Sequence, residues 1–346
     1  MSGPVLAVTV GDPVGIGPEI VARTLAEFSG DDSHHGIAVG DLGVMRRAVK
    51  ALGLDIEVRE VRSWDTEPAG EGVIDVYDIA VLGSVLPEWG VVDARAGRAA
   101  ITSIEVATKA ALAGQVSGIV TGPINKEAIW AAGSEHLGHT EMLGALTGVS
   151  QQDTMFVVRN TLVPGHHLKI FFATRHLSLR KALDKINRSG QLESIKRAGT
   201  ALRVFGTTNP RLAVAAINPH GGENGAFGDE EIVHLAPACA DARALGMDVS
   251  GPIPADSVFH HGLTGRYDGI LSQYHDQGHI AAKTFDFDGT ISVTVGVPIL
   301  RTSVDHGTAF DIAGTGRADH GTMKSAYLAG VEYSPFVDAI RAEYQP

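Results

Sequence analysis

The stretch that decides the fold is residues 5–19, VLAVTVGDPVGIGPE. Residues 5–10 form a short apolar run of the kind that makes a buried strand. A loop with three glycines follows, and Pro18 suits the first position of a helix. Glycines let the backbone approach a ligand, and a helix N-terminus favours an anion. The loop is neither GxGxxG nor a phosphate-binding loop ending in Lys-Ser/Thr, and a plain strand-to-helix turn would also explain it.

The same alternation continues along the chain. Further strand-like runs lie at 118–121, 154–158, 168–172, 212–217 and 269–272. Helix-like stretches lie at 18–28, 95–113, 177–204 and 230–245. This order predicts an α/β fold with mainly parallel sheets covered by helices, so the strand ends form the expected rim of an active site. Residues 63–72 are polar and rich in turn formers, which predicts an exposed loop.

Composition bounds the function. A chain of 346 residues is long enough for two domains, and its net charge of −12 argues against a nucleic-acid binder. Any anionic ligand must therefore meet a local basic cluster. The single cysteine, Cys239, excludes an internal disulfide and a cysteine-rich metal site. The opening MSGPVLAVTV lacks the features of a secretion signal, and no apolar run approaches a membrane span, so we expect a cytoplasmic protein.

Three histidines each follow an apolar strand-like run: His176 after LKIFFA, His220 after LAVAAIN and His275 after GILSQY. Because the carboxyl ends of parallel strands meet at one edge of a sheet, the three imidazoles could converge. Three neutral imidazoles can hold a divalent metal and leave positions open for a substrate. A purely structural role for each is the alternative. The spacing excludes a compact HExxH site, and His136 and His139 fit loop chemistry better than a metal pair.

A further cluster lies near the C-terminus. It comprises Lys283, Arg301 and residues 305–314, DHGTAFDIAG. An arginine that ends the apolar run VTVGVPIL suits a carboxylate or a phosphate, and a solvated surface arginine is the alternative. The chain has no GxSxG motif and no Cys/His pairing that would indicate nucleophilic hydrolysis.

Seven motifs, taken together, resemble the 4-hydroxythreonine-4-phosphate dehydrogenase (PdxA) family. In the family's order they are GDPVGIGPE, TGPINK, GHTE, NPHGGENG, PADS, YHDQG and RTSVDHGTAFDIAG. The family is similar in turn to isocitrate and isopropylmalate dehydrogenases. The resemblance implies two α/β/α domains with the active site in the cleft between them. The expected first domain is 1–125 with 290–346 and carries the cofactor loop, and the second is 126–289 with the metal ligands and dimer contacts.

The resemblance also implies roles for individual residues. A divalent metal (zinc, magnesium or cobalt) would be held by His176, His220 and His275, with one ligand, His275 by preference, coming from the second subunit of a homodimer. Substrate contacts fall on His139, Thr140, Lys283, Ser292 and Arg301. Cofactor contacts fall on Gly15, Gly17, His306, Gly307 and Asp311.

The implied reaction is NAD-dependent oxidation, with decarboxylation, of a 4-phosphorylated 3-hydroxy acid such as 4-phosphohydroxy-L-threonine, a reaction of pyridoxine biosynthesis. Ser292 stands where the biosynthetic enzymes have Asn, and TRHLSL replaces THLPL. These changes resemble a catabolic branch that acts on 4-phospho-D-threonate or 4-phospho-erythronate, and both substrates stay open. Asp256 in PADS is our candidate general base, with Lys283 as its competitor.

Two other classes of protein remain as alternatives. A metal-dependent hydrolase or lyase could use the same histidines to activate water, and a sugar-phosphate binding protein could keep the fold without turnover. Cofactor choice depends on Asp311, because a carboxylate at this loop position in isopropylmalate dehydrogenases accepts hydrogen bonds from the adenosine ribose and would repel a 2′-phosphate. We therefore expect NAD rather than NADP. The alternative is that Asp311 only caps a short helix beginning DIAG.

Overall fold

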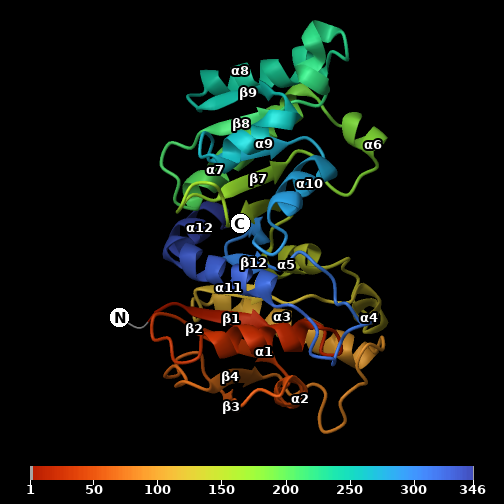
Figure 1. The fold of residues 1–346 in the computed structure, drawn as a ribbon, viewed down its shortest axis with the longest axis vertical. Helices are drawn as coiled ribbons and strands as arrows, with labels where there is room; N and C mark the ends of the chain where they lie inside the picture. The colour runs from red at the N-terminus through yellow and green to blue at the C-terminus, as the bar shows by residue number, and fades with distance from the viewer. Residues whose placement is uncertain (1–2, 346) are drawn as a thin grey trace. The chain divides into compact units, whose positions relative to one another are not determined.

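The computed structural model describes residues 3–345 and divides into two compact units (Figure 1). Unit 1 extends to Gln152 and resumes at Gly296, and unit 2 comprises Asp153–Val295. These bounds differ from the expected 125/126 and 289/290. Residues 126–152 belong to unit 1 because α4 (Lys126–Ala131) and α5 (His139–Thr147) pack on α3 (Ala94–Leu112). Residues 290–295 belong to unit 2 because they pair with its first strand.

Unit 1 contains a fully parallel sheet of six strands in the order β3-β4-β2-β1-β5-β12. The strands are β1 (Val5–Thr9), β2 (His35–Gly40), β3 (Glu57–Val61), β4 (Val73–Asp78), β5 (Gly118–Thr121) and β12 (Arg301–Ser303). From β1 the chain crosses to β2 on one side, and β5 lies on the other side. Ligands of such sheets bind outside the carboxyl ends of the strands at the point where the order reverses, and the glycine loop after β1 lies there.

Helices cover both faces of the unit 1 sheet. On one face α1 (Gly17–Glu27) packs against α2 (Leu42–Leu52) and α11 (Gly321–Tyr333), where a side chain added at Gly330 would approach Leu6. On the other face Ile104 of α3 packs in one core with Ala7 of β1. Leu6 and Ala7 are successive strand residues, so they point to opposite faces. The chain ends with the 3-10 turn η3 (Ser334–Phe336) and α12 (Val337–Tyr344).

Unit 2 contains a mixed sheet in the order β11-β6-β7-β10-β8-β9. Its strands are β6 (Asp153–Val158), β7 (Leu168–Phe172), β8 (Leu212–Ala215), β9 (Val249–Ile253), β10 (Gly269–Ser272) and β11 (Thr290–Val295). The pairs of β6 with β11 and β7 are antiparallel, whereas β10 pairs in parallel with β7 and β8, and β8 pairs in parallel with β9. The mainly parallel prediction therefore holds for unit 1 and for the β7-β10-β8-β9 half of unit 2.

Helices also cover both faces of the unit 2 sheet. Leu202 of α7 (Arg188–Val204) meets the face carrying Phe171, and α8 (Ala236–Ala244) packs beside α7. The opposite face, with Ile170, meets α9 (Ala255–Leu263) and α10 (His275–Phe285). Both covered faces are apolar, which explains why the strands read as continuous apolar runs.

Two helices that the sequence predicts as continuous are each divided. The stretch 177–204 contains α6 (Leu179–Leu183) and α7, and the Asn187 side chain accepts a hydrogen bond from the Gly190 amide, which starts α7 afresh. The stretch 230–245 begins as the π-helix η2 (Glu231–Leu235) and continues as α8. None of the helices in the described part of the chain has the length and apolar character needed to cross a bilayer.

Candidate functional site

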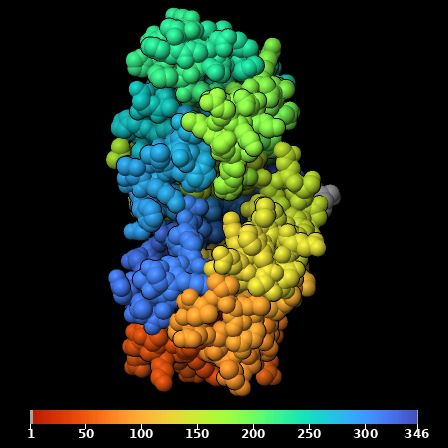
Figure 2. All heavy atoms as spheres, turned by 90° about the vertical axis from the view of Figure 1, so that its right-hand side faces the viewer, coloured from red at the N-terminus to blue at the C-terminus, as the bar shows by residue number. Residues whose placement is uncertain are grey.

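The three predicted metal histidines follow three neighbouring strands of unit 2. β10 pairs in parallel with β7 on one side and with β8 on the other. His176, His220 and His275 come shortly after the carboxyl ends of β7, β8 and β10 respectively. The segment after β7, which includes α6, is exposed and faces the viewer as a lobe of unit 2 in Figure 2. Because β7, β10 and β8 are parallel neighbours, the three loops that follow them lie at the same end of these strands.

Two of these imidazoles lie together. The ring centroids of His176 and His275 are 5.6 Å apart, and both residues line a pocket of about 270 Å³ with Leu177, Leu179 and Tyr274 among its walls. Imidazole nitrogens are donors that suit zinc and cobalt. The proximity of the His176 and His275 rings is compatible with a cation bound by both.

The His275 ring is held on two sides. Its Nδ1 lies 2.7 Å from Oδ1 of Asp276, and since an ionised carboxylate only accepts, Nδ1–H donates, which in a neutral ring leaves the lone pair on Nε2. One helical turn later, His279 stacks on the His275 ring with centroids 3.5 Å apart and planes 14° apart. The His279 ring itself packs against Phe156 and Phe172. The aromatic packing therefore fixes the plane of a candidate ligand.

His220 lies on a separate loop. Its backbone is left-handed (φ 53°, ψ 23°) within the 3-10 segment η1 (Pro219–Gly225), and its side chain is 66% exposed. Within residues 3–345, no three His, Cys, Asp or Glu side chains lie close enough together to enclose a metal ion. The structure thus brings together His176 and His275, and the complete three-histidine site stays a prediction.

The other predicted residues of unit 2 are spread over three elements. Asp256 is exposed in the first turn of α9, which packs against η1. Lys283 lies on α10 with Nζ 5.4 Å from the centroid of the Phe287 ring. Ser292 is buried in β11 opposite Phe156 of β6. The roles of these residues in catalysis and substrate binding stay predictions.

Unit 1 holds a buried arginine at the start of β12. Arg301 is 6% exposed, and its guanidinium donates to Oγ1 of Thr121 (3.0 and 2.7 Å) and to Oγ of Ser303 (2.8 Å). Burial lowers the pKa of Arg301 to about 10, which still leaves it charged at neutral pH. These hydroxyl partners are neutral, and the nearby charge of Asp305 acts against the effect of burial and favours the charged guanidinium.

His139 and Thr140 form the N-terminus of α5. The His139 Nε2 is buried and, among the described residues, has no hydrogen-bond partner. Burial, reinforced by the nearby charge of Arg301, holds the pKa of His139 well below its usual value. The imidazole is therefore neutral at physiological pH and can hydrogen-bond an anion without adding charge.

The glycine loop and residues 306–316 lie side by side in unit 1. The Ile16 amide donates to the Thr308 carbonyl at 3.0 Å. The Glu19 carboxylate is fully buried and accepts from the amides of Gly314 (2.9 Å) and Gly316 (2.7 Å). This contact joins the first helix of the chain to a turn almost 300 residues later.

The predicted cofactor residues of the glycine loop and of residues 306–316 differ in their surroundings. A Cβ on Gly15 would lie 2.9 Å from Cβ of Thr308, so close packing alone requires that glycine, whereas the space around Gly307 is open. Gly17 is likewise packed, against the Val10 carbonyl. The Nδ1 of His306 lies 3.0 Å from the carbonyl oxygen of Gly307.

Asp311 is exposed on a turn at residues 310–316, so no helix begins there for it to cap. The helix-cap explanation of this carboxylate is therefore wrong, because the local bonds, such as the Ile312 amide to the Ala309 carbonyl, are those of turns.

The sequence did not identify Asp12 as a candidate, although it lies at the start of the glycine loop. Its side chain is fully buried; Oδ1 accepts from the Val14 amide at 3.0 Å and Oδ2 has no hydrogen-bond partner among the described residues. Burial raises the pKa of Asp12 to about 6 despite hydrogen bonds from the amides of Val14 and Asn125. Such perturbed carboxyls concentrate at functional sites.

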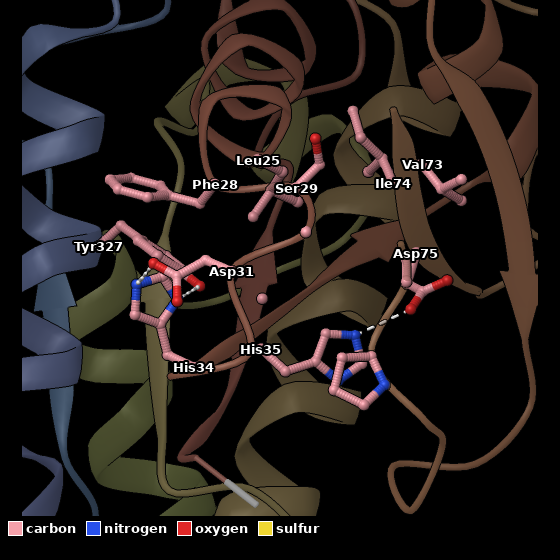
Figure 3. A pocket seen from close by; sticks show the side chains of 14 residues that line it. Leu25, Phe28, Ser29, Asp31, His34, His35, Val73, Ile74, Asp75 and Tyr327 are labelled. Atoms are coloured by element: carbon pink, nitrogen blue, oxygen red, sulfur yellow. Dashed lines mark hydrogen bonds and ion pairs between the residues drawn. The ribbon is translucent and has the colours of Figure 1, made fainter. Parts of the chain in front are cut away.

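A hollow at the amino ends of β2 and β4 is lined by another pair of histidines (Figure 3). His34 lies between Tyr327 (3.0 Å) and Asp31 (3.4 Å), and His35 pairs with Asp75 at 2.8 Å. The hollow has about 20 Å³, which holds a single water molecule rather than a substrate. The hollow lies at the amino ends of the strands, whereas the glycine loop lies at their carboxyl ends.

Comparison with known proteins adds a family to this geometry. The family model "Pyridoxal phosphate biosynthetic protein PdxA" matches residues 32–329. A Cutibacterium acnes protein named "Putative D-threonate 4-phosphate dehydrogenase" is 55% identical over 344 residues, covering 99% of this chain and 97% of the relative. The chain belongs to the PdxA family.

Solved structures of related dehydrogenases have the same fold. A 4-hydroxythreonine-4-phosphate dehydrogenase from Klebsiella pneumoniae has a TM-score of 0.85 at 41% identity, covering 96% of this chain and 98% of that chain. A terephthalate 1,2-cis-dihydrodiol dehydrogenase from Burkholderia xenovorans LB400 has a TM-score of 0.64 at 30% identity, covering 95% and 98%. The predicted α/β fold and oxidoreductase class are confirmed, and the hydrolase, lyase and binding-protein alternatives are set aside.

The raised pKa of Asp12 predicts a pH-dependent stability in this PdxA-family enzyme. Its folded pKa of about 6 exceeds the ordinary 3.8, so ionisation destabilises the fold as pH rises through this window. Asp12→Asn should therefore raise the melting temperature by several degrees at about pH 8, for a gain of up to about 3 kcal/mol, and by little at about pH 4.

Calorimetry across that pH range measures the effect, and Asp32→Asn, at an exposed carboxylate, is the control. A melting-temperature difference between Asp12→Asn and wild type that stays constant with pH would contradict the burial effect.

Proposed function

We propose that this chain oxidises D-threonate 4-phosphate with NAD and decarboxylates the product. The similarity that carries this proposal is 55% identity over nearly the whole chain to a protein named for that substrate, against 41% to the Klebsiella enzyme named for 4-hydroxythreonine 4-phosphate. The catabolic form of the motif TRHLSL and the presence of Ser292 support the same choice.

The proposed reaction has two steps, an oxidation followed by a decarboxylation. Hydride leaves carbon 3 for the nicotinamide while the hydroxyl proton passes to a base, giving a 3-keto acid. That β-keto acid loses its carboxyl group as carbon dioxide, and a proton adds at carbon 2 to give a three-carbon keto phosphate. Asp256 is the proposed proton acceptor, with Lys283 as the competing residue.

Each unit carries charged or polar groups that suit an anionic group such as the carboxylate or the phosphate of this substrate. In unit 1, Arg301 supplies a buried charge and neutral His139, with Thr140 at the N-terminus of α5, supplies hydrogen bonds. In unit 2, Lys283 adds a second cation and Ser292 a hydroxyl.

We propose that His176, His220 and His275 hold one divalent cation, with zinc, cobalt and magnesium as candidates. A bound cation would withdraw electron density from the substrate hydroxyl and stabilise negative charge on its oxygen. The pairing of His176 with His275 supports two of these ligands.

The second candidate substrate is 4-phosphohydroxy-L-threonine, which carries an amino group in place of the hydroxyl at carbon 2. It is favoured by the names of the solved relatives. Both substrates would undergo the same two reactions, so only a direct comparison separates them.

The rates with the two candidate substrates distinguish them. NADH formation should be at least about tenfold more efficient, as kcat/KM, with D-threonate 4-phosphate than with 4-phosphohydroxy-L-threonine, which corresponds to about 1.4 kcal/mol of transition-state discrimination. A preference for the amino substrate would favour the biosynthetic reaction instead.

Arg301→Met tests whether Arg301 binds the anionic substrate. It should raise the substrate KM by about ten- to a hundredfold because it removes a charged hydrogen bond. Unchanged KM and kcat would mean that Arg301 does not contact the substrate.

Cofactor choice gives the next prediction. We infer that exposed Asp311 faces the adenosine ribose, where its charge repels a 2′-phosphate. The native enzyme should prefer NAD to NADP, and Asp311→Lys should shift the ratio of kcat/KM toward NADP by about tenfold or more. Asp32→Lys makes the same change of charge at another exposed position of unit 1 and should leave the ratio as it is. Equal use of both cofactors by the native enzyme would count against the role of Asp311.

We further propose a homodimer in which one metal ligand comes from the partner. Mixing inactive His220→Ala and His275→Ala homodimers should then restore part of the activity, since one of the two sites in a mixed dimer is intact. Subunit exchange is verified independently by mass spectrometry. Exchange without any recovery would place His220 and His275 of each site in one subunit and would count against His275 as the partner's ligand.

A further inference from the structure

The loop that carries His220 has an unfavourable backbone. Residues 220–224 are all left-handed, with φ values of 53°, 70°, 84°, 44° and 56°. Three of them, His220, Glu223 and Asn224, are not glycine. Side chains disfavour this conformation, so successive residues adopt it only where surrounding contacts impose it.

A buried carboxylate lies against the entry of this loop. Glu231 is 2% exposed, and its Oε1 accepts from the amides of Ile217 and Asn218, both at 2.8 Å. Its Oε2 accepts from the Asn218 side-chain amide at 2.8 Å. A Cβ on Gly222 would lie 2.9 Å from that same oxygen. One carboxylate thus binds the entry of the loop and fills the inside of its turn.

The position of Glu231 is itself set by an uncommon element. It is the first residue of η2, the π-helix that continues into α8. Such turns are frequent at functional sites. Burial alone would raise the pKa of Glu231, but the hydrogen bonds from Asn218 and Ile217 outweigh it and hold the pKa below its usual value. The acceptor is therefore ionised, which strengthens its bonds to the amides.

We propose that Glu231 is the positioning residue for His220, because its carboxylate builds the left-handed turn that sets where this imidazole lies. The proposal rests on the role of His220 as a metal ligand given above. Glu231 does not touch substrate, cation or cofactor in this scheme; it acts through the loop.

The neighbouring Glu230 offers a matched control. Its Oε2 accepts from the same Asn218 side-chain amide at 2.6 Å, whereas the backbone amides of Ile217 and Asn218 donate to Glu231. Glu230→Gln therefore changes the charge beside the loop and keeps both backbone bonds of Glu231. Any effect of charge alone should appear in both variants.

The first measurement uses the metal-free protein. In Glu231→Ala, hydrogen exchange of the Ile217 and Asn218 amides should accelerate by about tenfold or more, because both lose their acceptor. Glu231→Gln, which keeps one acceptor oxygen, should show a smaller increase and serves if the alanine variant is too unstable to purify. Glu230→Gln should exchange like the native protein. Native exchange rates in Glu231→Ala, or in Glu231→Gln when it replaces it, would overturn the proposal.

The second measurement titrates Zn²⁺ against a chromophoric chelator at a temperature where every variant is folded. Loss of an outer support for a ligand weakens metal binding by about ten- to a hundredfold, which is the increase in Kd expected for the Glu231 variant used. An unchanged Zn²⁺ Kd despite faster exchange would also overturn the positioning role. His220→Ala separates the two claims: if it binds Zn²⁺ like the native protein, the ligand assignment fails, whereas the exchange data still decide whether Glu231 builds the turn.

Discussion

The rest of the structure depends on how buried carboxylates satisfy backbone amides in loops at the edges of the sheets. Amides in such loops have no ladder or helix partner, and a buried amide without an acceptor is costly. Glu19 accepts from Gly314 and Gly316 in unit 1, and Glu231 accepts from Ile217 and Asn218 in unit 2. In both units the acceptor begins or nearly begins a helix, which favours negative charge. The same device holds the loops that carry Asp311 and His220.

The sequence predicts the elements well where local pattern decides them. The apolar runs at 118–121, 168–172 and 269–272 coincide with β5, β7 and β10, and parallel pairing of β7, β10 and β8 follows from the alternation of strands and helices. That pairing is why three histidines distant in sequence reach one edge of a sheet. The antiparallel pairing of β6 with β11 is a long-range choice that no local pattern indicates.

The sequence alone does not indicate which residues depend on partners far along the chain. Nothing near Glu19 indicates that its acceptors will serve two glycines at the far end of the chain, and nothing in DEE, residues 229–231, indicates which carboxylate is buried. Asp12 had one local signal, its place directly after a buried strand. The sequence does not indicate the break at residues 184–187, because helix propensity continues on both sides and only the Asn187 cap marks the new start. Such features depend on burial, which a single sequence does not specify.

Unit 1 is assembled from two segments of chain, and this has a consequence for synthesis. All of unit 2 is translated before the chain beyond Gly296 exists. Until then β5 has β1 on one side and lacks β12 on the other, so its outer backbone groups are an open edge to which another strand could add. The nascent chain therefore passes through an interval in which unit 2 has all of its strands while unit 1 still lacks β12 and is exposed to mispairing.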